Sequence, residues 1–173
     1  MFDEIKTAFR LARGGAAERW GVPPDLAVLG KAIGNGFPLA AVVGRADLMA
    51  RLRETWVSST LATEFVSLAA ADAVLDVWEK VDVSDHIERI GTLMTERLEA
   101  DCASARLRVC GLPAMFFLQF DEEARERRFL LAAASRGVLI KRGAYNFPSL
   151  AHGDSEVTAT LEAVRGALAE ADA

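Results

Sequence analysis

The chain has 173 residues, of which 51% are hydrophobic and 26% charged, and its 20 basic and 25 acidic side chains give a net charge of −5. This composition excludes a disordered protein and fits one ordinary domain or two small ones. The acidic balance, without a basic stripe, argues against a dedicated nucleic-acid binder. No apolar run approaches the roughly 20 residues of a membrane-spanning helix. Because FDE follows Met1 directly, we expect a cytoplasmic protein without a signal peptide.

The first half of the chain alternates short apolar runs with helical patterns. Residues 25–30 and 40–44 are apolar runs that end in glycine, which predicts buried strands. Residues 45–54 predict a short helix. Residues 64–80 are apolar or small almost all the way round a helix, so we expect this helix to be buried.

The second half predicts an α+β unit of about 90 residues. It has three helical patterns, two of them carrying apolar residues at helical spacing: Ile87, Ile90, Met94 and Leu98 in the first, and Val157, Leu161, Val164 and Leu168 in the last. Between them we expect strands at 106–111, 113–120 and 138–143, and a helix that Gly137 terminates. Asp154 or Ser155 should cap the last helix. We place the domain boundary so that the domains are residues 1–82 and 83–173.

The cysteines and histidines predict no metal site. Cys102 and Cys110 match neither a metal-ligand pattern nor a disulfide framework, so we expect buried thiols. His86 and His152 lack a partner pattern, and we expect surface or hydrogen-bonded structural histidines.

One lysine has unusual surroundings, in the stretch LGKAIGNGFPLA, residues 29–40. Lys31 lies between an apolar run and a loop with several glycines, and a desolvated lysine has a depressed pKa. A neutral lysine amine can form a Schiff base with an aldehyde, including that of pyridoxal phosphate. The same pattern also fits a surface lysine in a glycine-rich turn.

Two other stretches favour the chemical interpretation. Asp3 ends an apolar strand in FDEIKTAFR, and a pyridoxal enzyme needs a carboxylate beside the pyridine nitrogen to keep the ring an electron sink. Thr60 precedes the helix of residues 64–80. A hydroxyl and N–H groups near a helix N-terminus suit a phosphate.

With these residues in place, the sequence resembles the class III aminotransferases of the type I pyridoxal-phosphate fold, which include ω-aminotransferases and glutamate-1-semialdehyde aminomutase. The resemblance rests on FDEIKTAFR, then GGAAERWGVPPDLAVLGKAIGNGFPLAAVVGR, then STLATEFVSLAAADAVL, and it covers nearly the whole chain. It implies an α/β fold: the C-terminal part of the large cofactor-binding domain, followed by a small α+β domain.

The resemblance also implies roles for single residues. Lys31 would be the Schiff-base lysine and proton carrier, and Asp3 would pair with the pyridine nitrogen of pyridoxal 5'-phosphate. Ile5 would pack against one face of the ring. Thr60 would bind the cofactor phosphate across the interface of a homodimer with shared active sites. The substrates would be an amine or amino acid and a carbonyl compound.

Length is the main departure from the family, whose members run to roughly 400 residues. The segment that would carry the phosphate loop and the second ring-stacking residue has no counterpart here. We therefore expect a C-terminal fragment that is inactive alone. The alternatives are a racemase or decarboxylase relative, and a non-catalytic remnant that acts as a dimerisation or interaction module.

Two positions bear on the substrate. Glu64-Phe65 replaces the Asn-Pro of many members and favours the aminomutase branch. Arg142 could bind a substrate carboxylate, although capping a strand end or pairing with a surface acid is the better interpretation of its position.

Overall fold

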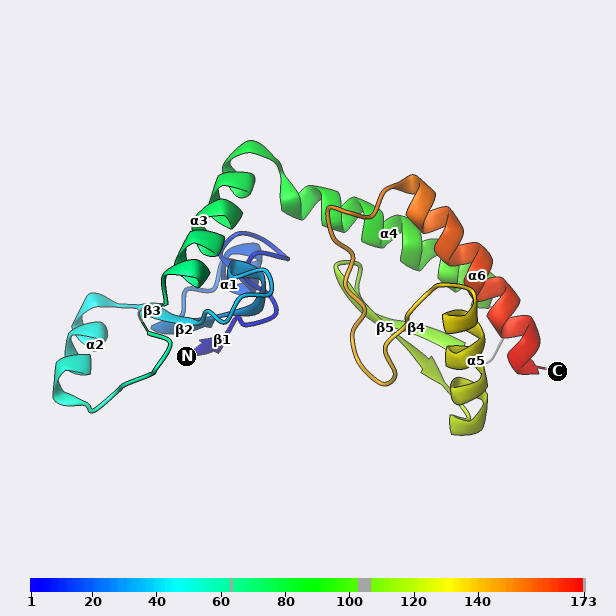
Figure 1. The fold of residues 1–173 in the computed structure, drawn as a ribbon, viewed down its shortest axis with the longest axis horizontal. Helices are drawn as coiled ribbons and strands as arrows, with labels where there is room; N and C mark the ends of the chain where they lie inside the picture. The colour runs from blue at the N-terminus through cyan, green and yellow to red at the C-terminus, as the bar shows by residue number, and fades with distance from the viewer. Residues whose placement is uncertain (63, 103–106, 173) are drawn as a thin grey trace. The chain divides into compact units, whose positions relative to one another are not determined.

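The computed structural model describes residues 1–62, 64–102 and 107–172. The chain folds into two compact units, Met1–Ser84 and Asp85–Ala173 (Figure 1). None of the helices within the described ranges is long and apolar enough to cross a membrane.

A three-stranded sheet forms the centre of the first unit. Its strands are β1 (Phe2–Asp3), β2 (Leu26–Leu29) and β3 (Ala41–Gly44), in the order β1-β2-β3. β1 runs parallel to β2 and β3 runs antiparallel to it, with Asp3 opposite Val28. The strands predicted at 25–30 and 40–44 are therefore present.

Short helices and one long helix accompany this sheet. They are α1 (Gly15–Trp20), the 3₁₀ turn η1 (Lys31–Ile33), α2 (Ala46–Ala50), the 3₁₀ turn η2 (Arg51–Glu54) and α3 (Phe65–Lys80). The helix predicted at 45–54 is thus divided, because its second half tightens into the 3₁₀ form that often ends a helix.

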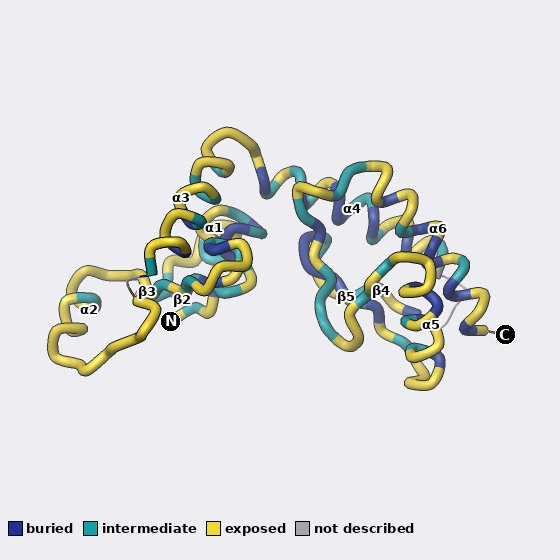
Figure 2. The backbone as a smooth tube through the Cα atoms, viewed as in Figure 1, coloured by how far each residue is buried: buried dark blue, intermediate teal, exposed yellow. Residues whose placement is uncertain are grey.

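The predicted burial of α3 is wrong for the described chain. Only Ser67 and Ala71 of this helix are buried, while Phe65 is 79% exposed (Figure 2). Trp78 gives α3 one firm contact, an edge-to-face packing on Phe9 with ring centroids 5.8 Å apart. A helix that is apolar all round needs cover on every side, and the first unit covers one side.

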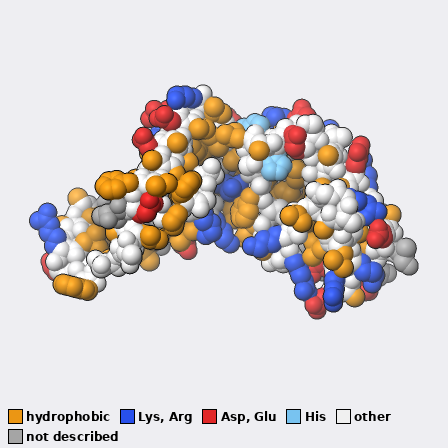
Figure 3. All heavy atoms as spheres, viewed as in Figure 1, with side chains coloured by type: hydrophobic (Ala, Val, Ile, Leu, Met, Phe, Trp, Pro, Cys, Tyr) orange, Lys and Arg blue, Asp and Glu red, His pale blue; other side chains and the backbone are white. Residues whose placement is uncertain are grey.

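The strands of the first unit show the same lack of cover. β2 is only half-buried, and Val42 and Val43 of β3 are exposed. The space-filling view shows apolar side chains gathered over α3 (Figure 3). Contiguous apolar surface of this kind is typical of an interaction face.

The second unit has a well-formed core. Its elements are α4 (Val83–Cys102), β4 (Leu107–Leu112), β5 (Met115–Phe120), α5 (Glu123–Ser135) and α6 (Asp154–Asp172). The predicted apolar faces of α4 and α6 are confirmed, since all eight of their named residues are buried. All of them except Ile87 belong to one core cluster with Phe129 of α5 and Phe116 of β5. Gly137 ends α5 with φ +82°, as predicted.

The strand predicted at 138–143 is absent. β4 and β5 pair antiparallel, with Leu112 opposite Met115. The segment after α5 instead meets β5 at a single bridge, in which Asn146 N donates to Phe116 O at 2.6 Å. Lys141 N donates to the Asn146 side chain. This backbone N–H therefore closes a local turn and does not pair with a neighbouring strand.

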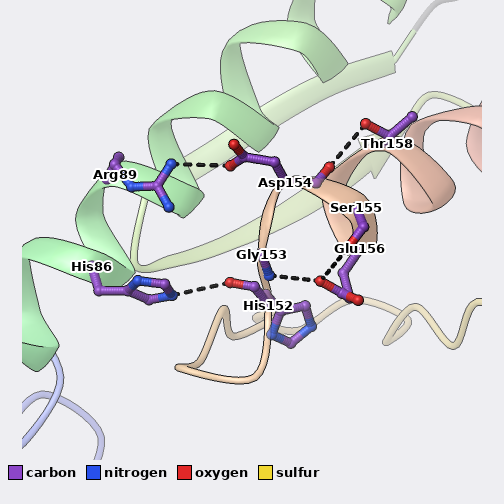
Figure 4. Close-up of polar contacts among 8 residues, drawn as sticks. All are labelled: His86, Arg89, His152, Gly153, Asp154, Ser155, Glu156 and Thr158. Atoms are coloured by element: carbon purple, nitrogen blue, oxygen red, sulfur yellow. Dashed lines mark hydrogen bonds and ion pairs between the residues drawn. The ribbon is translucent and has the colours of Figure 1, made fainter.

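The start of α6 is capped differently from the prediction (Figure 4). Asp154 is the first helical residue, and its carboxylate accepts from Arg89 at 3.1 Å. The capping group is Glu156, whose carboxylate accepts from Gly153 N at 2.8 Å. That bond, with a second from the Ser155 hydroxyl, lowers the pKa of Glu156.

Both histidines are structural, as expected. His86 Nε2–H donates to His152 O at 3.0 Å, which ties α4 to the loop before α6 (Figure 4). His152 Nδ1 in turn accepts from Ser149 N at 3.1 Å. Cys110 is a half-buried free thiol rather than a fully buried one, and the Cys102 side chain lies outside the described part of the chain.

Candidate functional site

The parallel pair β1 and β2 brings two predicted residues to one edge of the sheet. Asp3 is the last residue of β1, and Lys31 follows the end of β2 by two positions. The carboxyl ends of parallel strands meet at the same edge, which is where open α/β sheets bind ligands. This edge is the candidate site.

Lys31 holds a backbone conformation that lysine rarely adopts. Its φ is +48°, in the left-handed region that costs a residue with a β-carbon about 1–2 kcal/mol. The turn is fixed because Lys31 O accepts from Gly34 N at 3.1 Å and from Asn35 N at 2.9 Å. Strain of this kind persists where the surrounding structure over-determines it and gathers at functional sites.

The expected desolvation of Lys31 is wrong for the described chain. Its side chain is exposed, because the residues around it are glycines and the open end of a strand. The main chain of Lys31 is thus held by the turn, while its side chain is accessible from solvent.

Asp3 and Ile5 lie beside Lys31. Asp3 is exposed, and its Oδ1 accepts from Ile5 N at 3.0 Å. Ile5 is half-buried against Gly30, where an added β-carbon would lie 3.4 Å from Ile5 Cγ2. The aliphatic side chain thus packs on the residue that directly precedes Lys31.

Glu4, between Asp3 and Ile5, plays no part in the sequence-based prediction. Its side chain is 1% exposed and accepts hydrogen bonds from Ala16 N at 2.9 Å and Ala17 N at 2.8 Å. It therefore caps α1 from a distance. The sequence signal is the Gly14-Gly15 pair, because a β-carbon on Gly15 would lie 2.7 Å from the Glu4 carboxyl carbon.

Thr60 lies in the exposed segment that precedes α3. The first amides of α3 are already bound, because Glu64 accepts from Val66 N at 2.8 Å and Ser67 N at 2.6 Å. A phosphate at Thr60 would therefore rest on its hydroxyl and the preceding loop.

The Glu64 carboxyl group shows the strength of this cap. Hydrogen bonds from Ser67, and then from Val66 N–H, lower the pKa of Glu64. An ionised carboxylate at a helix N-terminus satisfies free amides and opposes the helix dipole. Glu64 thus has a structural role in addition to any influence on substrate choice.

Arg142 pairs with acids of its own unit. Its guanidinium binds Glu123 and Glu126, the second at 3.2 Å. These two bonds raise the pKa of Arg142. The interpretation of Arg142 as a partner of surface acids is confirmed.

The second unit contains a cavity of about 150 Å³, and none of the predicted site residues Lys31, Asp3, Ile5 and Thr60 lines it. Its walls are mostly apolar, with Asn146, His152 and Thr160 as the polar members. Within the ranges that the structure describes, no group of three His, Cys, Asp or Glu side chains is placed to hold a metal ion.

Comparison with known proteins identifies the sequence family. The family model for class III aminotransferases matches residues 1–168. A curated relative, the glutamate-1-semialdehyde 2,1-aminomutase of Thermomicrobium roseum, is 35% identical. The alignment covers 98% of this chain and 44% of the relative, so the chain spans less than half the length of this protein.

Solved structures agree with this result. The FumI protein of Sphingopyxis sp. MTA144, in its pyridoxal-phosphate internal aldimine form, matches with a TM-score of 0.88 and 27% identity, over 96% of this chain and 42% of that one. The ornithine aminotransferase of Toxoplasma gondii matches with a TM-score of 0.87 and 26% identity, over 98% and 42%. The predicted α/β fold class is confirmed as part of the pyridoxal-phosphate-dependent transaminase fold. The chain belongs to the class III aminotransferase family.

Proposed function

We propose that this chain is the lysine-bearing part of a pyridoxal-phosphate-dependent aminotransferase or aminomutase. The observation that carries the proposal is the strained Lys31 at the same sheet edge as Asp3. In this proposal residues 1–82 belong to the large cofactor-binding domain, and residues 83–173 form the small C-terminal domain.

The side chains at this edge fit pyridoxal phosphate. An exposed lysine amine can bond to an aldehyde, an exposed carboxylate can face a protonated ring nitrogen, and an aliphatic side chain can cover one ring face. Lys31, Asp3 and Ile5 supply these three groups. Thr60 would supply a hydroxyl to the phosphate, in the site of the neighbouring subunit.

When bound, pyridoxal phosphate supplies an aldehyde and a pyridine ring that withdraws electrons from the reacting carbon. Lys31 Nζ would hold the group covalently and, once released, would take the proton from the substrate carbon and return it. Asp3 would accept a hydrogen bond from the ring nitrogen and so keep that nitrogen protonated. Ile5 would limit the tilt of the ring.

The substrates we propose are an amine or amino acid and a carbonyl compound, with the reaction in the cytoplasm. The relative from T. roseum and the Glu64-Phe65 pair support an aminomutase of the glutamate-1-semialdehyde type. The exposed apolar face of α3 supports a homodimer with shared active sites, since such a face needs cover.

The test is an absorbance titration with pyridoxal phosphate on the wild type and on Lys31→Ala. It is run on the chain alone, and on the chain co-expressed with the N-terminal portion of the T. roseum aminomutase. We expect a yellow band that needs Lys31, and a borohydride-reduced adduct that peptide mapping assigns to that residue. A band that is equal in Lys31→Ala would refute the role of the lysine.

The pattern between the two preparations separates the remaining interpretations. A Lys31-dependent band only in the co-expressed preparation would show that the site needs the other part of the fold. Folded protein without such a band in either preparation would favour the non-catalytic interaction module, for which the exposed face of α3 is the supporting observation.

A further inference from the structure

Glu4 is the one acidic side chain of the first unit that is buried among the described residues, at 1% exposed. Glutamate is almost never fully buried unless its charge is paired or hydrogen-bonded. Its neighbours in the sequence, Asp3 and Ile5, are the two residues proposed to face the cofactor ring. The burial of the Glu4 side chain between these two residues therefore needs a structural or functional explanation.

The hydrogen bonds of Glu4 connect three segments. Its side chain accepts from Ala16 N and Ala17 N at the start of α1, and from the hydroxyl of Thr7. Its own backbone N–H donates to Val28 O on β2 at 2.9 Å. Glu4 thus fixes the end of β1 against both β2 and α1.

The space for this carboxyl group is provided by a glycine. Gly15 has φ +75°, and a β-carbon there would approach the Glu4 carboxyl carbon to 2.7 Å and Ala8 N to 2.9 Å. Only glycine combines this backbone angle with this closeness. The fold therefore keeps the first turn of α1 open for the side chain of Glu4.

The contacts continue from Glu4 to the site. With the backbone of Glu4 fixed, Asp3 on one side directs its carboxylate toward Ile5 N, and Ile5 on the other packs on Gly30. Gly30 immediately precedes Lys31. A shift of Glu4 would move Asp3 and Ile5 together.

We propose that Glu4 is a positioning residue, which anchors the backbone between Asp3 and Ile5 to α1 and so orients both side chains toward the cofactor. This inference rests on the proposed function, because the cofactor gives the orientation its purpose. Glu4 itself touches no reacting atom. It acts through its two neighbours.

The test compares Glu4→Gln with Glu18→Gln. The first replacement keeps the shape but directs an amide NH₂ at a backbone N–H. The second is the matched control, because exposed Glu18 accepts from Gly14 N at 2.6 Å at the same end of α1. Thr7→Val, which removes one of the three bonds to Glu4, serves as a milder variant should Glu4→Gln fail to fold.

The first readout is amide hydrogen exchange, which needs no cofactor. We expect the Ile5 N–H to exchange about tenfold faster or more in Glu4→Gln, and less so in Thr7→Val, because a charged buried hydrogen bond is lost. Glu18→Gln should leave Ile5 within about twofold of the wild type. Unchanged exchange at Ile5 in both variants of the Glu4 cluster would overturn the inference.

The second readout is the ¹⁵N shift of the pyridine nitrogen in labelled pyridoxal phosphate, measured on the co-expressed preparation. We expect Glu4→Gln to move this shift toward the value of Asp3→Asn, a result that loss of stability alone would not produce. An unmoved shift would overturn the inference. If the wild type binds no cofactor, the proposed function fails, and the Ile5 exchange still decides whether Glu4 positions its neighbours.

Discussion

Gly91 offers a sharp test of the packing of the second unit. It lies in the middle of α4, and a β-carbon there would be 2.5 Å from the carbonyl carbon of Pro113 and 3.1 Å from its Cα. Both atoms belong to the main chain of the turn between β4 and β5, so neither can swing aside. We therefore predict that Gly91→Ala destabilises the second unit.

The magnitude follows from two opposing effects. Alanine is favoured over glycine inside a helix by about 1 kcal/mol. Overpacking that shifts the backbone costs about 1–3 kcal/mol, occasionally more, and a contact with main chain on both sides belongs to the upper part of that range. The net expectation is a loss of about 1–2 kcal/mol in the free energy of unfolding.

Gly166 of α6 is the matched control. A β-carbon there would meet Arg136 Nε at 2.7 Å, the far end of a flexible side chain that can move. Gly166→Ala should gain most of the helix preference and lose only part of the exposed bonding of Arg136 with Glu170. We expect it to be neutral or stabilising.

The assay is urea unfolding followed by far-UV circular dichroism and by tryptophan fluorescence. Trp20, Trp56 and Trp78 are the only tryptophans of the chain, and all belong to the first unit, so fluorescence is an internal control that Gly91→Ala should leave unchanged. Equal midpoints for Gly91→Ala and Gly166→Ala would refute the close approach of α4 to the turn at Pro113.

Three further predictions concern single side chains. The Glu64 cap should stabilise α3 fully at a pH above the ordinary glutamate pKa of 4.5, and this stabilisation should be lost as the pH falls through the lower pKa of the folded state. Faster exchange of Ser67 N–H in acid would show this loss. Glu64→Gln should remove the pH dependence. Lys31→Gly should be more stable than Lys31→Ala by roughly 0.5–1 kcal/mol in urea, because glycine relieves the strain at φ +48°; equal stability would contradict the strained backbone. Arg142→Ala should leave the cofactor absorbance titration of the co-expressed preparation unchanged, because this arginine binds Glu123 and Glu126; weaker binding would place it near the site.

Sequence patterns predicted burial correctly where the chain itself provides the cover. The apolar spacing of α4 and α6 was sufficient because both helices bury that face within one unit. The prediction of a strand at 138–143 was wrong because a strand needs a pairing partner. The N–H of Lys141 instead donates to the Asn146 side chain, and Asn146 meets β5 at a single bridge. Burial of α3 failed for a related reason, since its apolar residues require cover that the described chain does not supply.

The candidate site likewise has features that the sequence predicted and features that only the structure shows. Lys31 and Asp3 were predicted from chemistry and spacing, and their roles stay predictions; their common sheet edge follows from the parallel pairing of β1 with β2. Glu4 was missed because its sequence signal, the Gly14-Gly15 pair, lies in a different segment of the chain, and only the folded structure brings the two together. The left-handed backbone of Lys31 was equally hidden, since composition carries no sign of φ for a residue other than glycine.

The arrangement of α6 has a consequence for how the protein is made. Val157, Leu161 and Val164 fill the middle of the core of the second unit, and Arg125 of α5 is buried where it binds Asp172 at the end of α6. α4, β4, β5 and α5 leave the ribosome before these partners exist. Their apolar faces are incompletely buried without α6, so the second unit completes its folding only after this helix has been translated. Until then Phe129 and its neighbours lack the cover that α6 gives them, and transiently exposed apolar surface of this kind promotes aggregation.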